Sequence, residues 1–243
     1  MSRRLLVPHA RETAAPVRVE GQAFHHLRVL RVGVGDALEV FDGKGRAFPA
    51  QVLSVEADFA LLRLGPGHTA LAGRPVSLLQ ALPKAEKLEF VLQKGTELGA
   101  HAFYPAVSER SVLRLSPAAA EARRTRWQRI AEEAARQCGR ADVPHVHAVQ
   151  GLLQAASALP PETRLLLLDE EEKAVRLADA AAVDAHAPLA LVVGPEGGLA
   201  RTEVEALQSL GAVSVSLGPL VLRTETAALA ALAVLRHREG LLG

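Results

Sequence analysis

The sequence lacks the features of several large classes of protein. It contains one cysteine, Cys138, among 243 residues, which excludes an internal disulfide and leaves a zinc site without a second thiolate. No run approaches eighteen consecutive apolar residues, and the first ten residues, MSRRLLVPHA, hold no long apolar segment. We therefore expect a soluble, cytoplasmic protein. Cys138 falls on the apolar side of a predicted helix, where we expect a buried small hydrophobic residue.

Two glycine signatures of nucleotide-binding proteins are also missing. A P-loop requires Gly-Lys-Ser or Gly-Lys-Thr at the start of a helix, and a dinucleotide site requires G-x-G-x-x-G after a strand. The glycine-rich loop that is present, Gly194-Pro195-Glu196-Gly197-Gly198, contains a proline that removes one backbone N–H from any phosphate nest. Because paired glycines let a flat ligand lie against bare backbone, this loop suits a nucleoside-like molecule better than a polyphosphate.

Charge is nearly balanced overall, with a formal net charge of +1, but it is segregated along the chain. Residues 1–31 carry six arginines against two glutamates, and residues 110–140 carry eight arginines against three glutamates. Residues 160–186 instead hold seven acids and three bases. This pattern predicts one basic face that could contact phosphates, with Arg-rich but merely solvated helix faces as the alternative.

The first part of the chain, residues 1–70, predicts a small β domain. Apolar and polar residues alternate over 37–41, 46–55 and 59–64, and the intervening segments are rich in Gly, Asp and Pro. Short strands joined by tight turns are typical of a small barrel or curled sheet. The adjacent His25 and His26 are weak evidence for a metal, because neighbours in a strand point to opposite faces, and we expect no metal site. Residues 65–75 read as a linker.

Residues 75–243 predict an α/β domain built on a parallel sheet. Strands are expected at 76–81, 103–107, 164–168, 189–193 and 213–217, with helices at 85–98, 117–138, from about 202, and at 224–236. Alternating strands and helices of this kind form parallel sheets whose ligands bind beyond the carboxyl ends of the strands. The loops after residues 193 and 217 would therefore open on the same edge.

These two loops contain charged residues that apolar packing does not need. Glu196, Arg223 and Glu225 lie within them or at the start of the following helix. Plain connecting turns are one interpretation, and a ligand site is the other. The acidic run 169–172 after a further strand predicts a solvated turn or the first turn of a helix, where it favours the helix dipole.

Five blocks of sequence, in order, resemble one known family. They are HHLRVLRVGVGDALEVFDGKG, KAEKLEFVLQKGTELGAHAFYPAVSERSV, RWQRIAEEAARQCGRADVPHV, GPEGGLARTEVEAL and LGPLVLRTETAALAALAVL. Together they are similar to the ribosomal RNA uridine-N3 methyltransferases of RsmE type, within the SPOUT superfamily. The resemblance covers nearly the whole chain.

The resemblance implies a PUA-like RNA-binding domain followed by a SPOUT domain with a carboxyl-terminal deep trefoil knot. Connectivity rules alone would make a knot a poor prediction. The implied cofactor is S-adenosylmethionine, held by three loops. The resemblance implies that the loop from Leu167 to Glu170 is the third wall of this site, as the alternative to a solvated turn. The cofactor-binding residues that we predict are Leu167, Gly194, Glu196, Gly197, Gly198, Leu217, Gly218, Leu222, Thr224 and Thr226.

RNA and a second copy of the chain are the expected partners. Four arginines are candidate RNA contacts: Arg28, Arg31, Arg110 and Arg140. The alternative interpretation of each is an ordinary surface residue. The helix at 224–236 is apolar on all sides, which requires burial on all sides. We therefore predict a homodimer with this helix near the interface.

The predicted reaction is methyl transfer to N3 of a uridine in 16S ribosomal RNA. Uridine N3 must lose a proton and then carries negative charge shared with two carbonyl groups, so a base and a cation are required nearby. Glu225 is the candidate base and Arg223 the candidate stabiliser, although these two could simply pair with each other. A ribose 2′-O methyltransferase and a non-enzymatic ribosome-assembly factor remain alternatives.

Overall fold

The structure, a computed structural model, describes residues 3–69, 73–84, 86–184 and 186–243. It divides into two compact units, and we describe each by itself. The first falls within Met1–Ala72 and Glu132–Val143, and the second within Gly73–Ala131 and Pro144–Gly243. The sequence places a boundary near residues 70–75 but does not indicate that residues 132–143 group with the first unit.

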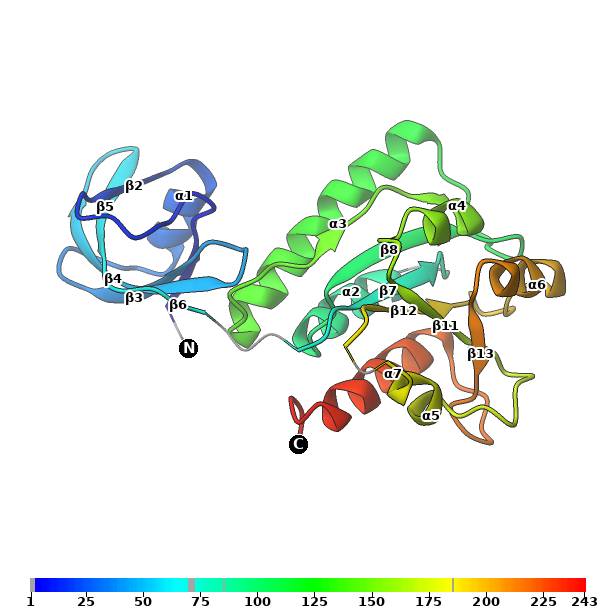
Figure 1. The fold of residues 1–243 in the computed structure, drawn as a ribbon. Helices are drawn as coiled ribbons and strands as arrows, with labels where there is room; N and C mark the ends of the chain where they lie inside the picture. The colour runs from blue at the N-terminus through cyan, green and yellow to red at the C-terminus, as the bar shows by residue number, and fades with distance from the viewer. Residues whose placement is uncertain (1–2, 70–72, 85, 185) are drawn as a thin grey trace. The chain divides into compact units, whose positions relative to one another are not determined.

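The first unit contains a six-stranded sheet, helix α1 and, from Glu132 on, the end of helix α3 (Pro117–Cys138) (Figure 1). Its strands run in the order β1-β3-β4-β5-β2, with β6 paired to β4; β1 is parallel to β3 and the other pairs are antiparallel. Strands β3, β4 and β5 have the predicted bounds, whereas β6 lies in the segment predicted as a linker. The elements are β1 (Arg4–Leu6), β2 (Val17–Glu20), α1 (Gly21–Val29), β3 (Ala37–Phe41), β4 (Arg46–Val55), β5 (Phe59–Leu64) and β6 (His68–Thr69).

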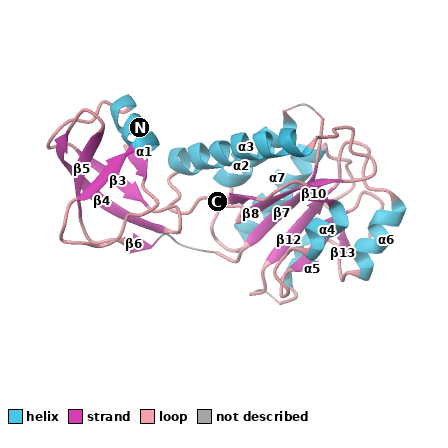
Figure 2. Ribbon diagram, turned by 90° about the horizontal axis from the view of Figure 1, so that it is seen from above, coloured by secondary structure: helices cyan, strands magenta, loops and turns pink. Residues whose placement is uncertain are grey.

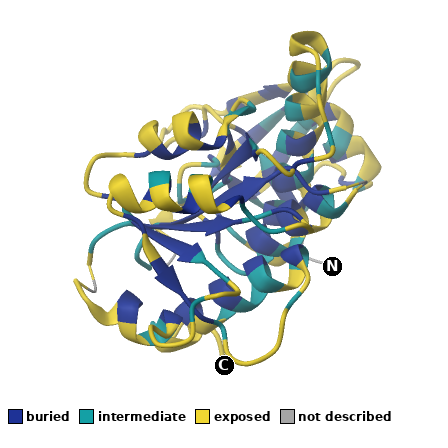
Figure 3. Cartoon of the chain, turned by 90° about the vertical axis from the view of Figure 1, so that its right-hand side faces the viewer, coloured by how far each residue is buried: buried dark blue, intermediate teal, exposed yellow. Residues whose placement is uncertain are grey.

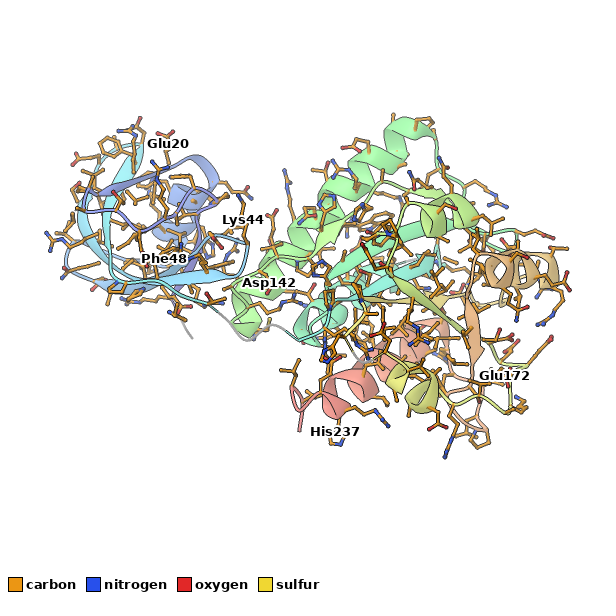
Figure 4. All side chains as sticks on the ribbon, viewed as in Figure 1. Glu20, Lys44, Phe48, Asp142, Glu172 and His237 are labelled. Carbon is orange, nitrogen blue, oxygen red and sulfur yellow. The ribbon has the colours of Figure 1, made fainter. Side chains whose placement is uncertain are left out.

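Alternation along the strands builds the core of this unit. In β2, Val17 and Val19 are buried while Arg18 and Glu20 face solvent. Phe48, near the start of β4, is fully buried, and Figure 4 labels it among the side chains of this unit. Helix α1 adds Phe24 and Leu27 to the same apolar cluster. The period of two that predicts these strands therefore decides which side chains leave water.

The second unit is a parallel sheet with helices on both faces. The order of strands is β10-β8-β7-β12-β11-β13, with β9 paired to β8, and every pair is parallel. The elements are β7 (Val76–Ala81), α2 (Lys87–Glu97), β8 (Ala102–Val107), α3 (Pro117–Cys138), β9 (His145–Val146), β10 (Gln150–Gly151), α4 (Leu152–Ser157), β11 (Arg164–Leu168), α5 (Leu177–Ala182), β12 (Leu189–Val193), α6 (Arg201–Ser209), β13 (Val213–Val215) and α7 (Thr224–Arg238). The predicted parallel α/β class is confirmed.

Strand β12 shows how the sheet separates two cores. Leu189, Leu191 and Val193 join the cluster that contains residues of α2, α3, α5 and α7. The alternate residues Ala190 and Val192 join the cluster that contains residues of α4 and α6. Figure 2 shows the strands between the helices, and Figure 3 shows buried strands beneath helices whose outer faces are exposed. A strand buried on both faces reads as a continuous apolar run, as LALVV does.

Helices α3 and α7 each expose a residue that the sequence predicts to be buried. Cys138 is exposed, so the prediction of a buried residue is wrong: the apolar stripe of α3 continues to its last residue, but its packing does not. Helix α7 buries Ala228, Leu232 and Leu235, whereas Val234 on its other side is 41% exposed in the single chain.

The deep knot stays a prediction. Within the described residues, no helix has the length and apolar character needed to cross a membrane.

Candidate functional site

A cavity of about 350 Å³ opens where β11, β12 and β13 end. All three strands are parallel, so the segments that follow them emerge at one edge of the sheet. The walls come from residues 167–173, 193–204 and 215–227, joined by Arg110 from the loop after β8. The run of acids after β11 therefore lines the site as a third wall: Asp169, Glu170 and Glu171 all face the cavity.

Most of the predicted cofactor-binding residues line this cavity. Those that do are Leu167, Gly194, Glu196, Gly198, Leu217, Gly218, Leu222 and Thr224. Gly197 and Thr226 are not part of the lining. Thr226 lies two residues after Thr224, which places it on the exposed side of α7. The carbonyl of Gly197 instead accepts a hydrogen bond of 2.8 Å from Nη1 of Arg110.

The loop after β12 can close on itself only because it lacks side chains at two positions. A Cβ on Gly194 would come within 3.1 Å of the carbonyl carbon of Gly198 and 3.2 Å of the backbone nitrogen of Leu199. Gly198 has a φ of +68°, a left-handed conformation that side chains disfavour. Its N–H donates to the carbonyl of Pro195 at 3.0 Å. The glycine pair is thus required by the turn itself, which brings bare backbone to the cavity wall.

A buried polar network fastens this loop to the start of α7. Oγ1 of Thr224 donates to the carbonyl of Gly194 at 2.5 Å and accepts from Nε2 of Gln80 at 2.9 Å. Gln80, at the end of β7, is only 1% exposed. A buried amide in a strand that otherwise reads VSLLA is costly unless it is hydrogen-bonded, so its presence was a readable signal that the sequence analysis missed.

Outside the cavity wall, a lysine bridges two carboxylates. Nζ of Lys87, in the first turn of α2, lies 2.9 Å from Oε1 of Glu196 and 3.3 Å from Oε2 of Glu225. The backbone N–H of Lys84 also donates to Glu196, at 3.1 Å. Glu225 does not line the cavity, its side chain is 15% exposed, and its partner is Lys87 rather than Arg223. The sequence analysis missed Lys87 because a lysine at the start of an exposed helix is unremarkable.

The contact between Lys87 and Glu196 shifts the pKa values of both groups. The hydrogen bond to Glu196 raises the pKa of Lys87 above its usual value. Partial burial of Glu196 on its own would raise the pKa of its carboxyl, but hydrogen bonds from Lys87 and from backbone N–H groups outweigh burial and lower it. Both groups therefore stay charged near neutral pH.

Arg223 and Arg110, two of the three arginines in the cavity lining, differ in their contacts. Arg223, the residue before α7, is exposed and lines the cavity; its carbonyl accepts the backbone N–H of Ala227 at 2.8 Å, but its side chain makes no hydrogen bond or ion pair within the described part of the chain. The guanidinium of Arg110 donates a hydrogen bond to the carbonyl of Gly197. The backbone N–H of its neighbour Glu109 donates to the carboxylate of Glu203 of α6 at 2.8 Å. Arg110, predicted as an RNA contact, thus stands beside the cavity, while Arg223 is free to meet a ligand.

The acidic wall has its own counter-ion. Nη1 of Arg201, at the start of α6, lies 3.4 Å from Asp169 and 3.2 Å from Glu171. Glu172 is not part of the lining, and its carboxylate accepts the backbone N–H groups of Ala174 and Val175. Figure 4 labels this residue on the loop after β11. With Lys173 in the same wall, the three acids and two bases leave this side of the cavity a formal charge of −1, whereas the whole lining, with Glu196, Arg110 and Arg223 added, is formally balanced.

The remaining predicted arginines belong to the first unit. Arg28 and Arg31 are exposed, and Arg28 borders a shallow hollow beside the start of α1 together with Glu20, Phe24 and Asp58. Arg140 is half-buried and pairs with Asp142, Nη2 to Oδ2 at 2.5 Å. Arg28 and Arg31 therefore remain available to RNA, whereas Arg140 is already engaged within the protein.

Comparison with known proteins agrees with this architecture. Residues 72–236 match the model of an RNA methyltransferase domain, and residues 19–65 match that of an RNA methyltransferase PUA domain. Ribosomal RNA small subunit methyltransferase E of Bacillus subtilis is 36% identical over 95% of this chain and 93% of its own length. The Mycobacterium bovis protein of that name is 38% identical over 91% of this chain and 86% of its own.

A solved structure extends the agreement to three dimensions. Ribosomal RNA small subunit methyltransferase E from Neisseria gonorrhoeae, bound to S-adenosyl methionine, superposes with a TM-score of 0.87 at 32% identity. The match covers 98% of each chain. The chain therefore belongs to the ribosomal RNA small subunit methyltransferase E family of RNA methyltransferases, with a PUA domain at its amino-terminal end.

Proposed function

We propose that this protein transfers the methyl group of S-adenosylmethionine to N3 of a uridine in 16S ribosomal RNA. The observation that carries the proposal is the cavity formed by the three loops after β11, β12 and β13. A volume of about 350 Å³ is within the range of small-molecule sites. The Neisseria gonorrhoeae relative, which binds S-adenosyl methionine, has the same fold.

The lining suits S-adenosylmethionine by its chemistry. Apolar side chains such as Leu167, Leu217 and Leu222 offer surface to a flat adenine ring. Gly218 has open space where a side chain would stand, so backbone is accessible there. Asp169 and Glu170 supply negative charge for a sulfonium and for hydroxyl donors. The proline in the glycine loop leaves a poor site for a polyphosphate.

The bound cofactor would supply an electrophilic methyl group, and the protein would supply position and charge. Transfer requires the uridine nitrogen to approach in line at near-attack distance, which a fixed cavity wall provides. Arg223 can place its guanidinium beside the uridine carbonyls, where negative charge develops as N3 loses its proton. Its freedom from internal partners supports this role.

The contacts of Glu225 favour a role other than the general base predicted from sequence. Its carboxylate stands outside the cavity lining and next to a protonated lysine, Lys87. A carboxylate stabilised by a neighbouring cation is a weak proton acceptor. We propose that Glu225 positions the start of α7 and thereby Arg223.

The proposed substrate also assigns roles outside the cavity. Arg28 and Arg31 in the PUA domain and Arg110 beside the cavity would contact RNA phosphates, in a protein that acts in the cytoplasm. A second copy of the chain would cover the apolar side of α7 that includes Val234, forming a homodimer. Light scattering at micromolar concentration is expected to give twice the mass of 25.7 kDa, and a monomer would contradict this part of the proposal.

The decisive experiment follows the methyl group into RNA. Small ribosomal subunits and naked 16S RNA are incubated with the protein and methyl-labelled S-adenosylmethionine, then digested to nucleosides and analysed by mass spectrometry. Label in 3-methyluridine is the expected result, and primer extension should stop at the modified base because N3 methylation blocks pairing. Label on ribose would favour a 2′-O methyltransferase, and no cofactor binding by calorimetry would favour an assembly factor.

Replacement of Arg223 tests the mechanism separately. Arg223→Ala is expected to lower kcat about 100-fold or more, as loss of a charge-stabilising donor does, while the Kd for S-adenosylmethionine changes little. Thermal stability should be unchanged because Arg223 is exposed and unpaired within the described residues. A normal rate of methylation would remove Arg223 from the mechanism.

A further inference from the structure

Gln80, near the end of β7, and Lys87, at the start of α2, contact the cavity walls from outside the cavity. Neither residue lines the cavity, yet each contacts both the glycine loop after β12 and the start of α7. The inner contact is the buried amide of Gln80 with Thr224 and the carbonyl of Gly194. The outer contact is the ammonium of Lys87 with two carboxylates.

The two contacts join the same pair of segments. Glu196 lies two residues beyond Gly194 in the glycine loop, and Glu225 follows Thr224 in the first turn of α7. Glu196 and Glu225 would otherwise present two partly buried carboxylates to each other, because both bind one nitrogen within 3.3 Å. Like charges at this separation repel strongly when partly removed from water. A cation between them converts the repulsion into a bridge.

We propose that Lys87 is a positioning residue for cofactor binding and methyl transfer, acting as an electrostatic bridge that holds the glycine loop against the start of α7. The bridge fixes Glu196 in the cavity wall and, through Glu225, the backbone that carries Arg223. This inference rests on the proposed function, since it assigns Lys87 a role in that same site.

Charge, and not only packing, is what the bridge requires. The Nζ atom is the sole part of Lys87 that meets Glu196 and Glu225 in the ion pairs described. Lys87→Arg should therefore preserve the function in large part, whereas Lys87→Met, which keeps a similar length, should not. Glu225→Gln should relieve the repulsion that Lys87→Met exposes, because it removes one of the two uncompensated charges.

Helix α2 provides a matched control. Lys94 lies two turns after Lys87 on the same side of the helix, and its Nζ pairs with Glu97 at 2.8 Å. Neither Lys94 nor Glu97 borders the cavity. Lys94→Met therefore removes one cation and one ion pair from the same helix without touching the bridge.

The experiment measures S-adenosylmethionine binding by calorimetry and methyl transfer to RNA for wild type, Lys87→Met, Lys87→Arg and Lys94→Met. We expect Lys87→Met to raise the Kd for S-adenosylmethionine and to lower kcat/KM by about 10- to 100-fold, as displaced site loops do. Lys87→Arg and Lys94→Met should stay within about threefold of wild type. The double variant Lys87→Met/Glu225→Gln should bind the cofactor better than Lys87→Met alone.

The pH dependence separates an electrostatic bridge from a packing defect. The charged groups that meet Glu196 are Lys87 on α2 and, through the same nitrogen, Glu225 on α7; Arg110 binds the adjacent Gly197. In wild type the lowered pKa of Glu196 keeps it ionised as pH falls below neutral. Without Lys87, part of the lowering of that pKa is lost, so Glu196 takes up a proton at a higher pH in Lys87→Met than in wild type. Protonation removes one of the two uncompensated charges, as Glu225→Gln does, so the loss of cofactor affinity in Lys87→Met relative to wild type should shrink as pH falls. A packing defect would change affinity by one factor at every pH.

The outcomes distinguish this inference from the proposed function. If wild type binds no S-adenosylmethionine, the proposed function fails. If wild type binds and Lys87→Met binds equally well over the same pH range, only the bridge fails. If Lys87→Met does not fold, the double variant and Lys87→Arg decide: recovery of cofactor binding by both supports the bridge, and loss of binding in Lys87→Arg overturns it.

Discussion

Thr224→Val tests how far a single hydroxyl holds the cofactor loops together. Valine keeps the shape of threonine but removes the oxygen that donates to Gly194 at 2.5 Å and accepts from Gln80 at 2.9 Å. Thr224 is 6% exposed, so water cannot replace the lost partners. The substitution therefore leaves a carbonyl and an amide N–H short of a hydrogen bond inside the protein.

The magnitude follows from those two groups. Gln80 keeps hydrogen bonds of 3.0 Å to the carbonyl of Ala81 and 3.5 Å to that of Gly194, so the loss is partial. Unsatisfied buried groups cost about 1–3 kcal/mol each, and we expect the free energy of unfolding to fall by about 2 kcal/mol. In a protein of this size that corresponds to a fall in Tm of about 4–8 °C.

The assay is thermal unfolding followed by circular dichroism, with and without S-adenosylmethionine. The transition that the cofactor raises identifies the second unit, because a ligand stabilises the unit that binds it. Thr226→Val is the matched control, since it makes the same change two residues later on the exposed side of α7. Equal Tm values for the two variants would refute the reasoning that the buried network stabilises the loops.

Two further predictions concern other parts of the second unit. Arg236→Met should lower the free energy of unfolding by about 3 kcal/mol, because the buried guanidinium donates to Glu239 at 2.6 Å and to the carbonyls of Arg74 and Gly99 at 2.8 and 2.5 Å; urea unfolding measures it, and an effect no larger than that of the exposed Arg238→Met would contradict it. Burial, and then the nearby His145, lower the pKa of His147 from 6.5 to about 4. Between these pH values the imidazole of His147 therefore binds a proton in the unfolded chain but not in the folded protein. The free energy of unfolding should fall as pH drops from about 6.5 toward 4. His147→Phe, which keeps a ring against Tyr104, should lose less stability over that window in urea titrations at several pH values, and an identical slope would refute the assignment.

The long elements could be predicted from sequence because each has its own pattern. The runs that became β7, β11 and β12 are bounded by turn residues and are mostly apolar, so their bounds follow from local composition. Elements of two or three residues, such as β1, β9 and β10, escaped prediction because they bury too few side chains to create a period. The helices α4 and α5, of six residues each, were missed for the same reason.

The cavity was predicted in part, and the limit is physical. Glycines and charges in loops indicate where backbone is unusual, which is how Gly194, Gly198 and Arg223 were found. Contacts between side chains that lie far apart in the sequence leave no local pattern of this kind. Lys87 lies 109 residues from Glu196 and 138 from Glu225 in the numbering, and only the fold brings the three together.

The pairing of β7 with β12 also determines when the protein can become active. Val76–Ala81 are synthesised early, but the neighbour that completes the middle of the sheet is Leu189–Val193. Contacts between such distant segments form slowly, because a long loop must close first. A nascent chain on the ribosome would hold its early strands with one edge uncovered until the last quarter of the polypeptide emerges. A chain that terminates before Leu189 would lack β12 and the loop that follows it. It could not form the cavity proposed to bind S-adenosylmethionine, even if its amino-terminal domain folds.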